Sequence, residues 1–414
     1  MLNGPFPPWP NFTQEEADAV SKVLLSNKVN YWTGQESRTF EKEFAEFAGT
    51  KYAIALSNGT LALDLALQGL GIGWQNGGAA EDEVIVTSRS FIASVSTIVN
   101  AGARPVFADV DAQSGNISGA TVATVITPNT RAILAVHLGG WPCDMDDLRK
   151  AIGARDIKLV EDCAQAHGAL YKGKPVGSLG DVAAWSFCQD KIMTTGGEGG
   201  MVTCDDEMMW RRMWAYKDHG KSYEAVYERE HAPGFRWLHE SFGTNWRITE
   251  MQSVIGRIQL RRMPEWQAAR AANAAVLTQA LTPFAGKAGP VRVPEVRCAT
   301  CPYCDLQTGC RHAWYKYYAY VRPENLKDGW DRDRIAAEIS AAGVPCMQGS
   351  CSEMYLEKAF DDRGLRPNVP LPIARSLGET SLMLVVHPTL EQEHLTHAAQ
   401  VIADVLGRAA KWHS

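Results

Sequence analysis

Three stretches in the first half of the chain carry residue types that can bind and activate a small molecule. The first is Ser57-Asn58-Gly59-Thr60, which follows an apolar run and precedes a helix-like segment. Backbone N–H groups at a helix N-terminus attract anions, and Gly59 would allow close approach of a phosphate, so this segment is a candidate anion site. An ordinary turn with a threonine cap fits this segment equally well.

The second is Asp162, a carboxylate at the end of an apolar run and followed by Cys163-Ala164-Gln165. At the end of a buried strand, such a carboxylate can keep a pyridine nitrogen protonated, and Gln165 can hydrogen-bond an oxygen of the same ring. Asp162 is equally suited to cap the turn after the strand.

The third is the segment from Trp185 to Gly200, in which Lys191 follows a strand-like run and enters a glycine-rich turn. A lysine amine forms a Schiff base with an aldehyde and shuttles protons once it is released. Ser186, five residues before the lysine, adds a hydroxyl. Most lysines in proteins are solvated surface charges, so Lys191 is a candidate catalytic residue only in combination with the other segments. Phe91, which follows the apolar run Val84–Val86, could stack on a flat ring, although core packing is the commoner use of phenylalanine.

The elements that would position these residues alternate along the chain. Helix-like segments lie between strand-like apolar runs, for example at Leu61–Gln68, Ile92–Asn100 and Met145–Ile152. This alternation predicts an α/β fold with a mostly parallel sheet covered on both faces, which binds ligands at the carboxyl ends of its strands. The strand-like runs are Ala53–Leu56, Val84–Val86, Val106–Ala108, Ala132–Val136, Leu159–Val160, Val182–Phe187 and Met201–Thr203.

The ends of the chain carry helix signals. A capping box at Thr13 and Glu16 predicts a helix to about Leu25, and phenylalanines at 40, 44 and 47 predict a second helix that stops at Gly49. A capping box at Thr249 predicts the start of a long helix, and the regular alternation of strands and helices ends there. The expected later elements are a strand over Trp314–Val321, a helix over Asp333–Ala342, a strand over Leu382–His387 and a final helix capped by the box Thr389-Leu390-Glu391-Gln392, which begins at Thr389.

From this pattern we expect a large domain over residues 1–250, which includes an N-terminal arm over 1–35, and a smaller α+β domain over 251–414. The segments described above resemble the DegT/DnrJ/EryC1/StrS family of PLP-dependent sugar aminotransferases, members of the aspartate aminotransferase superfamily with fold type I. The resemblance covers nearly the whole chain. It is carried by Phe40–Ala45, Ser57–Leu63, Glu161–Gly168, the Lys191 segment, Asn245-Trp246-Arg247 and Val386–Leu390.

The resemblance implies a role for each matched position. Lys191 would form the Schiff base with pyridoxal 5′-phosphate (PLP) and move the proton during transamination, while Asp162 would pair with the pyridine nitrogen. Gln165 would contact the ring hydroxyl and Phe91 would stack on the ring. The implied phosphate ligands are Gly59, Thr60 and Ser186.

Asn245 would reach the phosphate of the partner subunit's PLP, so the resemblance implies a homodimer with shared active sites. His219 also matches a family position, without an assigned role. Family members that dehydrate deoxysugars have histidine where this chain has Lys191, so the lysine favours transamination.

The implied reaction converts the keto group of a sugar, with a nucleotide-linked keto-sugar as the leading candidate, into an amine, and glutamate or glutamine would be the amino donor. A cyclitol ketone or a free keto-sugar acid is an alternative substrate. An alternative of another class is a non-catalytic PLP-binding regulatory protein, which would need a DNA-binding appendage or a lost lysine; the sequence shows neither.

A cysteine cluster departs from the family pattern. It lies in an apparent insertion over residues 298–312 and has the spacing C-x2-C-x2-C-x5-C, with His312 close behind. Such spacing suits structural Zn²⁺, and an iron–sulfur cluster, reduced thiols or air-oxidised disulfides are the other interpretations. The cluster consists of Cys298, Cys301, Cys304 and Cys310. A looser pair, Cys346 and Cys351, is expected to be ordinary buried thiols.

The composition excludes several classes of protein. The 414 residues carry a net charge of −6, which argues against a nucleic-acid-binding surface. No run reaches the roughly 18 apolar residues of a membrane span, and the N-terminus lacks the features of a signal peptide. Ten cysteines are too few for a disulfide scaffold of this length. We therefore expect a cytoplasmic enzyme with no membrane or nucleic-acid partner.

Overall fold

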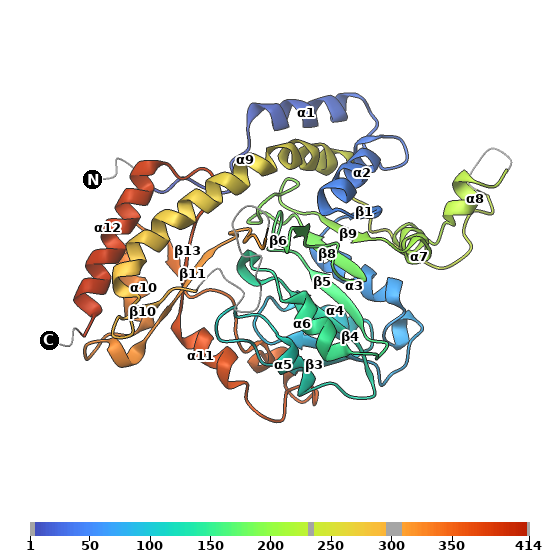
Figure 1. Cartoon of the computed structure of the whole chain (residues 1–414). Coiled ribbons are helices and arrows are strands. Elements are labelled where there is room, and N and C mark those ends of the chain that lie inside the picture. The colour runs from blue at the N-terminus through green and yellow to red at the C-terminus, as the bar shows by residue number, and fades with distance from the viewer. Residues whose placement is uncertain (1–4, 231–235, 295–308, 412–414) are drawn as a thin grey trace.

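The computed structural model describes residues 5–230, 236–294 and 309–411 (Figure 1). Its centre is a seven-stranded sheet with the order β1-β9-β8-β5-β4-β2-β3. Strand β9 pairs antiparallel with both neighbours, and the other pairs are parallel, as the alternating pattern predicts. The strands are β1 (Tyr52–Leu56), β2 (Glu83–Thr87), β3 (Arg104–Ala108), β4 (Thr130–Val136), β5 (Lys158–Asp162), β8 (Val182–Ser186) and β9 (Gly200–Cys204).

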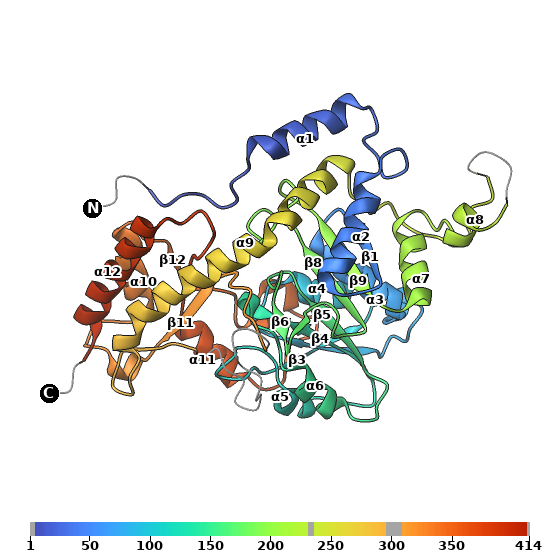
Figure 2. The same ribbon diagram turned by 45° about the horizontal axis from the view of Figure 1, so that its top comes forward.

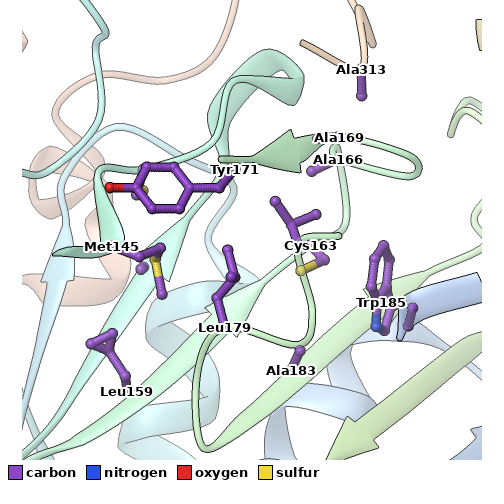
Figure 3. Close-up of a cluster of buried hydrophobic side chains, with 14 of the residues drawn as sticks. Met145, Leu159, Cys163, Ala166, Ala169, Tyr171, Leu179, Ala183, Trp185 and Ala313 are labelled. Atoms are coloured by element: carbon purple, nitrogen blue, oxygen red, sulfur yellow. The ribbon is translucent and has the colours of Figure 1, made fainter. Parts of the chain in front are cut away.

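Helices cover both faces of this sheet, so its strands are apolar on both sides. Because strand residues alternate between faces, Leu159 and Trp185 belong to one core and Val160 and Ala184 to the other. Figure 3 shows part of the first core. The first face packs against α2 (Glu36–Ala48), α5 (Gly119–Ala123) and α6 (Met145–Ile152), and the second against α3 (Gly59–Leu70), α4 (Ala93–Asn100) and α7 (Glu207–Lys217).

The predicted helix signals near the N-terminus are confirmed. In α1 (Gln14–Leu25), the Thr13 N–H donates to the Glu16 carboxylate at 2.6 Å. Helix α2 ends at Gly49, which adopts a left-handed φ of 71°.

The long helix α9 (Glu250–Leu281) begins at the Thr249 capping box and crosses from the large sheet to a four-stranded antiparallel sheet of order β10-β11-β13-β12 (Figure 2). A third core lies between this sheet, α9 and the helices α10 and α12. The remaining elements are β6 (Leu170–Tyr171), β7 (Lys174–Pro175), α8 (Tyr223–Tyr227), β10 (Val291–Arg292), β11 (Tyr317–Val321), α10 (Arg332–Ala341), β12 (Cys346–Met347), α11 (Pro372–Thr380), β13 (Ser381–Leu384) and α12 (Gln392–Ala409).

Three expectations for this region need correction. Strand β11 starts only at Tyr317, because Trp314 has a left-handed φ of 53° that interrupts an extended chain. Strand β13 ends at Leu384, three residues before His387. The N-cap of α12 is Glu391 instead of Thr389: the Glu391 N–H donates to His394 Nδ1 at 3.1 Å.

The third core is built from residues after 270, but the second core also contains Met354, Tyr355 and Phe360 of the expected small domain, and the boundary between residues 250 and 251 stays a prediction. Among the described residues, no helix is long and apolar enough to cross a membrane.

Candidate active site

Asp162 lies at the carboxyl end of β5, on the face covered by α3 and α4. Its Oδ2 accepts a hydrogen bond from Ser94 Oγ of α4 at 2.9 Å, and its Oδ1 accepts one from the Ala164 N–H at 3.1 Å. Burial raises the pKa of Asp162, while these bonds and the positive charge of Lys191 act to lower it. The carboxylate is therefore held in place but is poorly solvated, and a cation at the site would stabilise its ionised form.

A second carboxylate braces the same strand end. The buried Glu161 accepts bonds from the N–H groups of Gly177, Leu179 and Gly180 at 2.6–2.9 Å and lies 3.0 Å from His137 Nε2. Burial acts to raise the pKa of Glu161, but the bonds from His137 and the main chain outweigh it, so the pKa lies below its usual value.

His137 is a hydrogen-bonding brace for this strand end. Its Nδ1 accepts from the Cys143 N–H at 3.0 Å, so Nε2 carries the proton and donates to Glu161. Cys163 lies beside this pair, but both ring nitrogens of His137 are already engaged, which makes the group structural. The brace fixes the strand that presents Asp162.

The predicted phosphate segment forms the N-terminus of α3. Asn58 caps the helix by accepting from the Leu61 N–H at 2.9 Å. A Cβ at Gly59 would lie 2.5 Å from Ser186 Cβ, and one at Gly200 would lie 2.3 Å from the Asn58 carbonyl oxygen. The helix end therefore rests directly against Ser186 at the end of β8, and glycine is required for this contact. The structure brings Gly59, Thr60 and Ser186 together, as expected for one anion site.

Lys191 lies in the turn between β8 and β9. Its Nζ is 3.7 Å from Asp190 Oδ1 and 5.2 Å from the centre of the Tyr315 ring, and its side chain is 17% exposed. The Tyr315 hydroxyl donates to Asp190. Burial acts to raise the pKa of Asp190, but Lys191 and Tyr315 outweigh it and lower the pKa. The lysine amine is therefore partly enclosed, next to a charged carboxylate.

The glycine-rich turn closes behind the lysine. Gly196 and Gly197 have φ values of 86° and 114°, which other residues rarely adopt. The Thr194 N–H donates to Gln259 Oε1 of α9 at 2.8 Å, which ties the turn to that helix.

Phe91 follows the end of β2 and Gln165 follows the end of β5, and their side chains differ in exposure. The Phe91 side chain is 69% exposed, so it is not a core phenylalanine and its ring face is free for stacking. The Gln165 side chain is buried, and its Oε1 accepts from the Gly139 N–H at 2.7 Å. Because the oxygen is engaged, the amide NH₂ of Gln165 is the group left to donate to a ligand.

The segment containing Asn245 runs beside the end of β1. The Ser57 N–H donates to the Trp246 carbonyl at 3.0 Å, and Asn245 pairs with Asp218 in an isolated bridge. Asn245 itself is exposed. His219, for which the sequence suggested no role, has a left-handed φ of 61° and donates its N–H to the Thr244 carbonyl. The role of Asn245 toward a partner subunit stays a prediction.

Of the predicted metal ligands, Cys298, Cys301 and Cys304 lie outside the described residues. Cys310 is half-buried, and its sulfur accepts from the Lys172 N–H at 3.4 Å. In the later pair Cys346 is buried as expected, but Cys351 is exposed, so the expectation of two buried thiols is wrong for Cys351. It follows β12 in a loop whose side chains are partly open to solvent.

Four residues of this region were missed by the sequence analysis: Ser94, His137, Asp190 and Tyr315. None stands out by its residue type alone, and the contacts that define them join positions 24 to 125 residues apart, counted from Ser94 to Asp162, His137 to Glu161 and Tyr315 to Asp190. Their only signal in the sequence was proximity to a strand end: Ser94 follows Phe91, His137 follows the apolar run ending at Val136, and Asp190 precedes Lys191.

The convergence of an acid, a lysine and an anion site at one sheet edge agrees with comparisons to known proteins. The family model of the DegT/DnrJ/EryC1/StrS aminotransferases matches residues 10–404. The chain belongs to this family. It is a PLP-dependent aminotransferase of fold type I.

Individual relatives match between two thirds of the chain and almost all of it. GDP-perosamine synthase from Caulobacter vibrioides is 35% identical over 96% of this chain and 97% of its own. L-glutamine:2-deoxy-scyllo-inosose aminotransferase from Streptoalloteichus tenebrarius is 36% identical over 67% of this chain and 65% of its own. The crystal structure of an aminotransferase from Psychrobacter cryohalolentis is 60% identical, covers 97% of this chain and 99% of its own, and has a TM-score of 0.92.

Proposed function

We propose that this aminotransferase converts the keto group of a nucleotide-linked sugar into an amine, with PLP held at the edge where β5 and β8 end. The observation that supports it is the approach of α3 to Ser186 beside Asp162 and the Lys191 turn. The residues fit PLP: a tight helix N-terminus suits its phosphate, and a buried carboxylate with a raised pKa suits a cationic pyridine nitrogen.

When bound, PLP supplies an aldehyde for a Schiff base and an electron-accepting ring. Asp162 holds the proton on the ring nitrogen, and Ser94 and the Ala164 N–H keep its carboxylate in position. Lys191 Nζ would be the group that holds the aldehyde and, once released, the base that accepts and returns a proton. Phe91, whose ring is exposed, would stack on the ring, and the amide NH₂ of Gln165, whose oxygen accepts from the Gly139 N–H, would donate to the ring oxygen.

The substrate class and the donor follow from the relatives' names and stay proposals. A GDP-perosamine synthase at 35% identity supports a nucleotide-linked keto-sugar. The inosose aminotransferase at 36% identity supports a cyclitol ketone as the second candidate and glutamine as a donor beside glutamate. Histidine at the lysine position would have favoured dehydration, whereas this chain has Lys191.

Two experiments test this function. Borohydride reduction of the yellow holoenzyme followed by peptide mapping should place the cofactor on Lys191, and Lys191→Ala should abolish turnover while retaining some cofactor. Label on another lysine, or substantial activity in Lys191→Ala, would refute the assignment. GDP- and dTDP-linked keto-sugars and scyllo-inosose should then be added separately to enzyme aminated with glutamate or glutamine. Faster loss of the aminated cofactor with the cyclitol would overturn the substrate proposal.

We also propose that the active unit is a homodimer in which Asn245 contacts the partner subunit's PLP. The segment before Asn245 carries aromatic side chains that this chain leaves bare: Trp237 is 89% and Phe242 99% exposed. Figure 1 shows that α8, which starts this segment, projects from the body of the protein. Mixing Lys191→Ala and Asn245→Ala subunits should restore partial activity through one intact site, whereas a fully active monomer in sedimentation would contradict the dimer.

A structural Zn²⁺ held by Cys298, Cys301, Cys304 and Cys310 remains our proposal for the cysteine cluster. A cytoplasmic location, also still a prediction, would keep these thiols reduced and able to bind metal. Elemental analysis of protein prepared without chelator should find about one zinc per chain. A value near zero, with all four thiols titrating freely, would leave only a cysteine-rich loop, and iron with sulfide would indicate a cluster.

A further inference from the structure

The segment of residues 5–12 contacts the turn that carries Lys191. The indole Nε1 of Trp9 donates a hydrogen bond to the Lys191 carbonyl oxygen at 2.8 Å, across 182 residues of sequence. The Trp9 ring packs edge-on against Trp266 of α9, with ring centres 5.0 Å apart, and lies nearly parallel to His387 at 6.1 Å. Trp9 therefore joins the lysine turn to α9 and to the segment after β13.

The same segment, which we call the N-terminal strap, is also held by residues of the C-terminal region. The Phe6 ring contacts His394 of α12 with ring centres 5.4 Å apart, and Thr389 Oγ1 donates to the Pro8 carbonyl at 3.1 Å. Figure 2 shows the strap leading from the side of α12 to α1, which packs on α9. These two contacts with the C-terminal region hold the chain immediately before Trp9.

A buried cation lies under the indole ring. The Arg270 guanidinium carbon is 5.0 Å from the Trp9 ring centre, and the side chain is almost fully buried. Its Nη1 donates to the carbonyls of Trp314 and Tyr315, whereas its Nε and Nη2 have no hydrogen-bond partner among the described residues. Burial lowers the pKa of Arg270 to about 9. The cation–π contact offsets part of this desolvation, so the indole fits this one position best.

We propose that Trp9 is a positioning residue for Lys191: its indole N–H fixes the peptide group that follows the lysine, and so fixes where Nζ reaches. The other described main-chain bond of this residue is its own N–H to the Cys188 carbonyl, which lies within the same turn and does not tie the turn to the rest of the protein. A displacement of about 1 Å in a reacting group can cost about a hundredfold in rate, so one external anchor is significant. The inference rests on the proposed role of Lys191.

The first test measures the anchor without cofactor. Trp9→Phe keeps a ring beside Trp266 and Arg270 but removes the N–H donor, and Trp74→Phe, at a tryptophan 57% exposed and far along the chain, is the matched control. In cofactor-free protein, the amide hydrogens of Lys191, Thr194 and Gly197 should exchange about five times faster in Trp9→Phe, the effect of losing one hydrogen bond. Exchange within twofold of the wild type, with Trp74→Phe equal to it, would overturn the anchor.

The second test measures positioning. When PLP is added to cofactor-free protein, the visible absorbance band of the Schiff base should form about tenfold more slowly in Trp9→Phe, and the pH midpoint of that band should move by about half a unit. Melting temperature should fall by no more than about 2–4 °C below that of Trp74→Phe, the effect of one hydrogen bond. Faster exchange with an unchanged band and rate would show an anchor without positioning and overturn the proposal. Borohydride label on another lysine would refute the proposed function, while the exchange result would still report on the strap.

Discussion

Replacing Gly59 with alanine tests whether α3 rests against Ser186 as closely as the structure shows. The new Cβ would lie 2.5 Å from Ser186 Cβ and 2.8 Å from its Oγ. Carbon atoms pack best at about 3.5–4.0 Å, so the helix end or the strand end must move by about 1 Å. Overpacking of this kind costs about 1–3 kcal/mol, and the better helix propensity of alanine returns at most about 1 kcal/mol. We expect a net loss of about 1–2 kcal/mol in the free energy of unfolding.

The matched control is Gly407→Ala in α12, where a Cβ would meet nothing within 4 Å. This control should stabilise the protein by up to about 1 kcal/mol. Urea unfolding of cofactor-free protein measures both variants, and equilibrium dialysis measures PLP affinity. Because the shift moves the helix end away from Ser186, the affinity of Gly59→Ala for PLP should fall about tenfold, or about 1.4 kcal/mol. Wild-type stability and affinity in Gly59→Ala would refute both the contact and the phosphate site.

Two other substitutions separate function from stability. Asp162→Asn should abolish most turnover yet make cofactor-free protein more stable at pH 7, because burial raises the pKa of Asp162 above 3.8 and its ionisation in the folded state is unfavourable. This gain should vanish as the pH falls below about 3.8, and unfolding curves at several pH values check it. His137→Ala should cost about 2–3 kcal/mol, because Glu161 loses one bond to a buried charge but keeps three N–H donors. Folding lowers the pKa of Glu161, so the stability that this carboxylate contributes is present above pH 4.5 and is lost as the pH falls through its folded-state pKa. The free energies of unfolding of wild type and His137→Ala should therefore converge in acid. A difference that does not change with pH would contradict the brace.

The sequence by itself determined the order of elements and the residues with chemical potential. Short apolar runs and helical patterns are local properties, so the seven strand-like runs and the capping boxes at Thr13 and Thr249 all correspond to observed elements. Lys191, Asp162 and the Ser57–Thr60 segment stood out for the same reason, because each motif is contiguous along the chain. Where a competing contact acts at a distance, local pattern failed, as at Thr389, whose hydroxyl bonds Pro8 instead of capping α12.

Only the tertiary structure decided how these residues act together. The sheet places β8 beside β5, with β9 between β8 and β1, and long segments connect these strands. The closeness of Gly59 to Ser186 therefore has no trace in local pattern. The pKa of Asp162 depends on its burial beneath α4. The orientation of the Gln165 amide depends on the hydrogen bond that its oxygen accepts from the Gly139 N–H. Trp9 reaches Lys191 across 182 residues. Burial, close approach and long-range hydrogen bonds are properties of packed elements, and they appear only when the whole chain has folded.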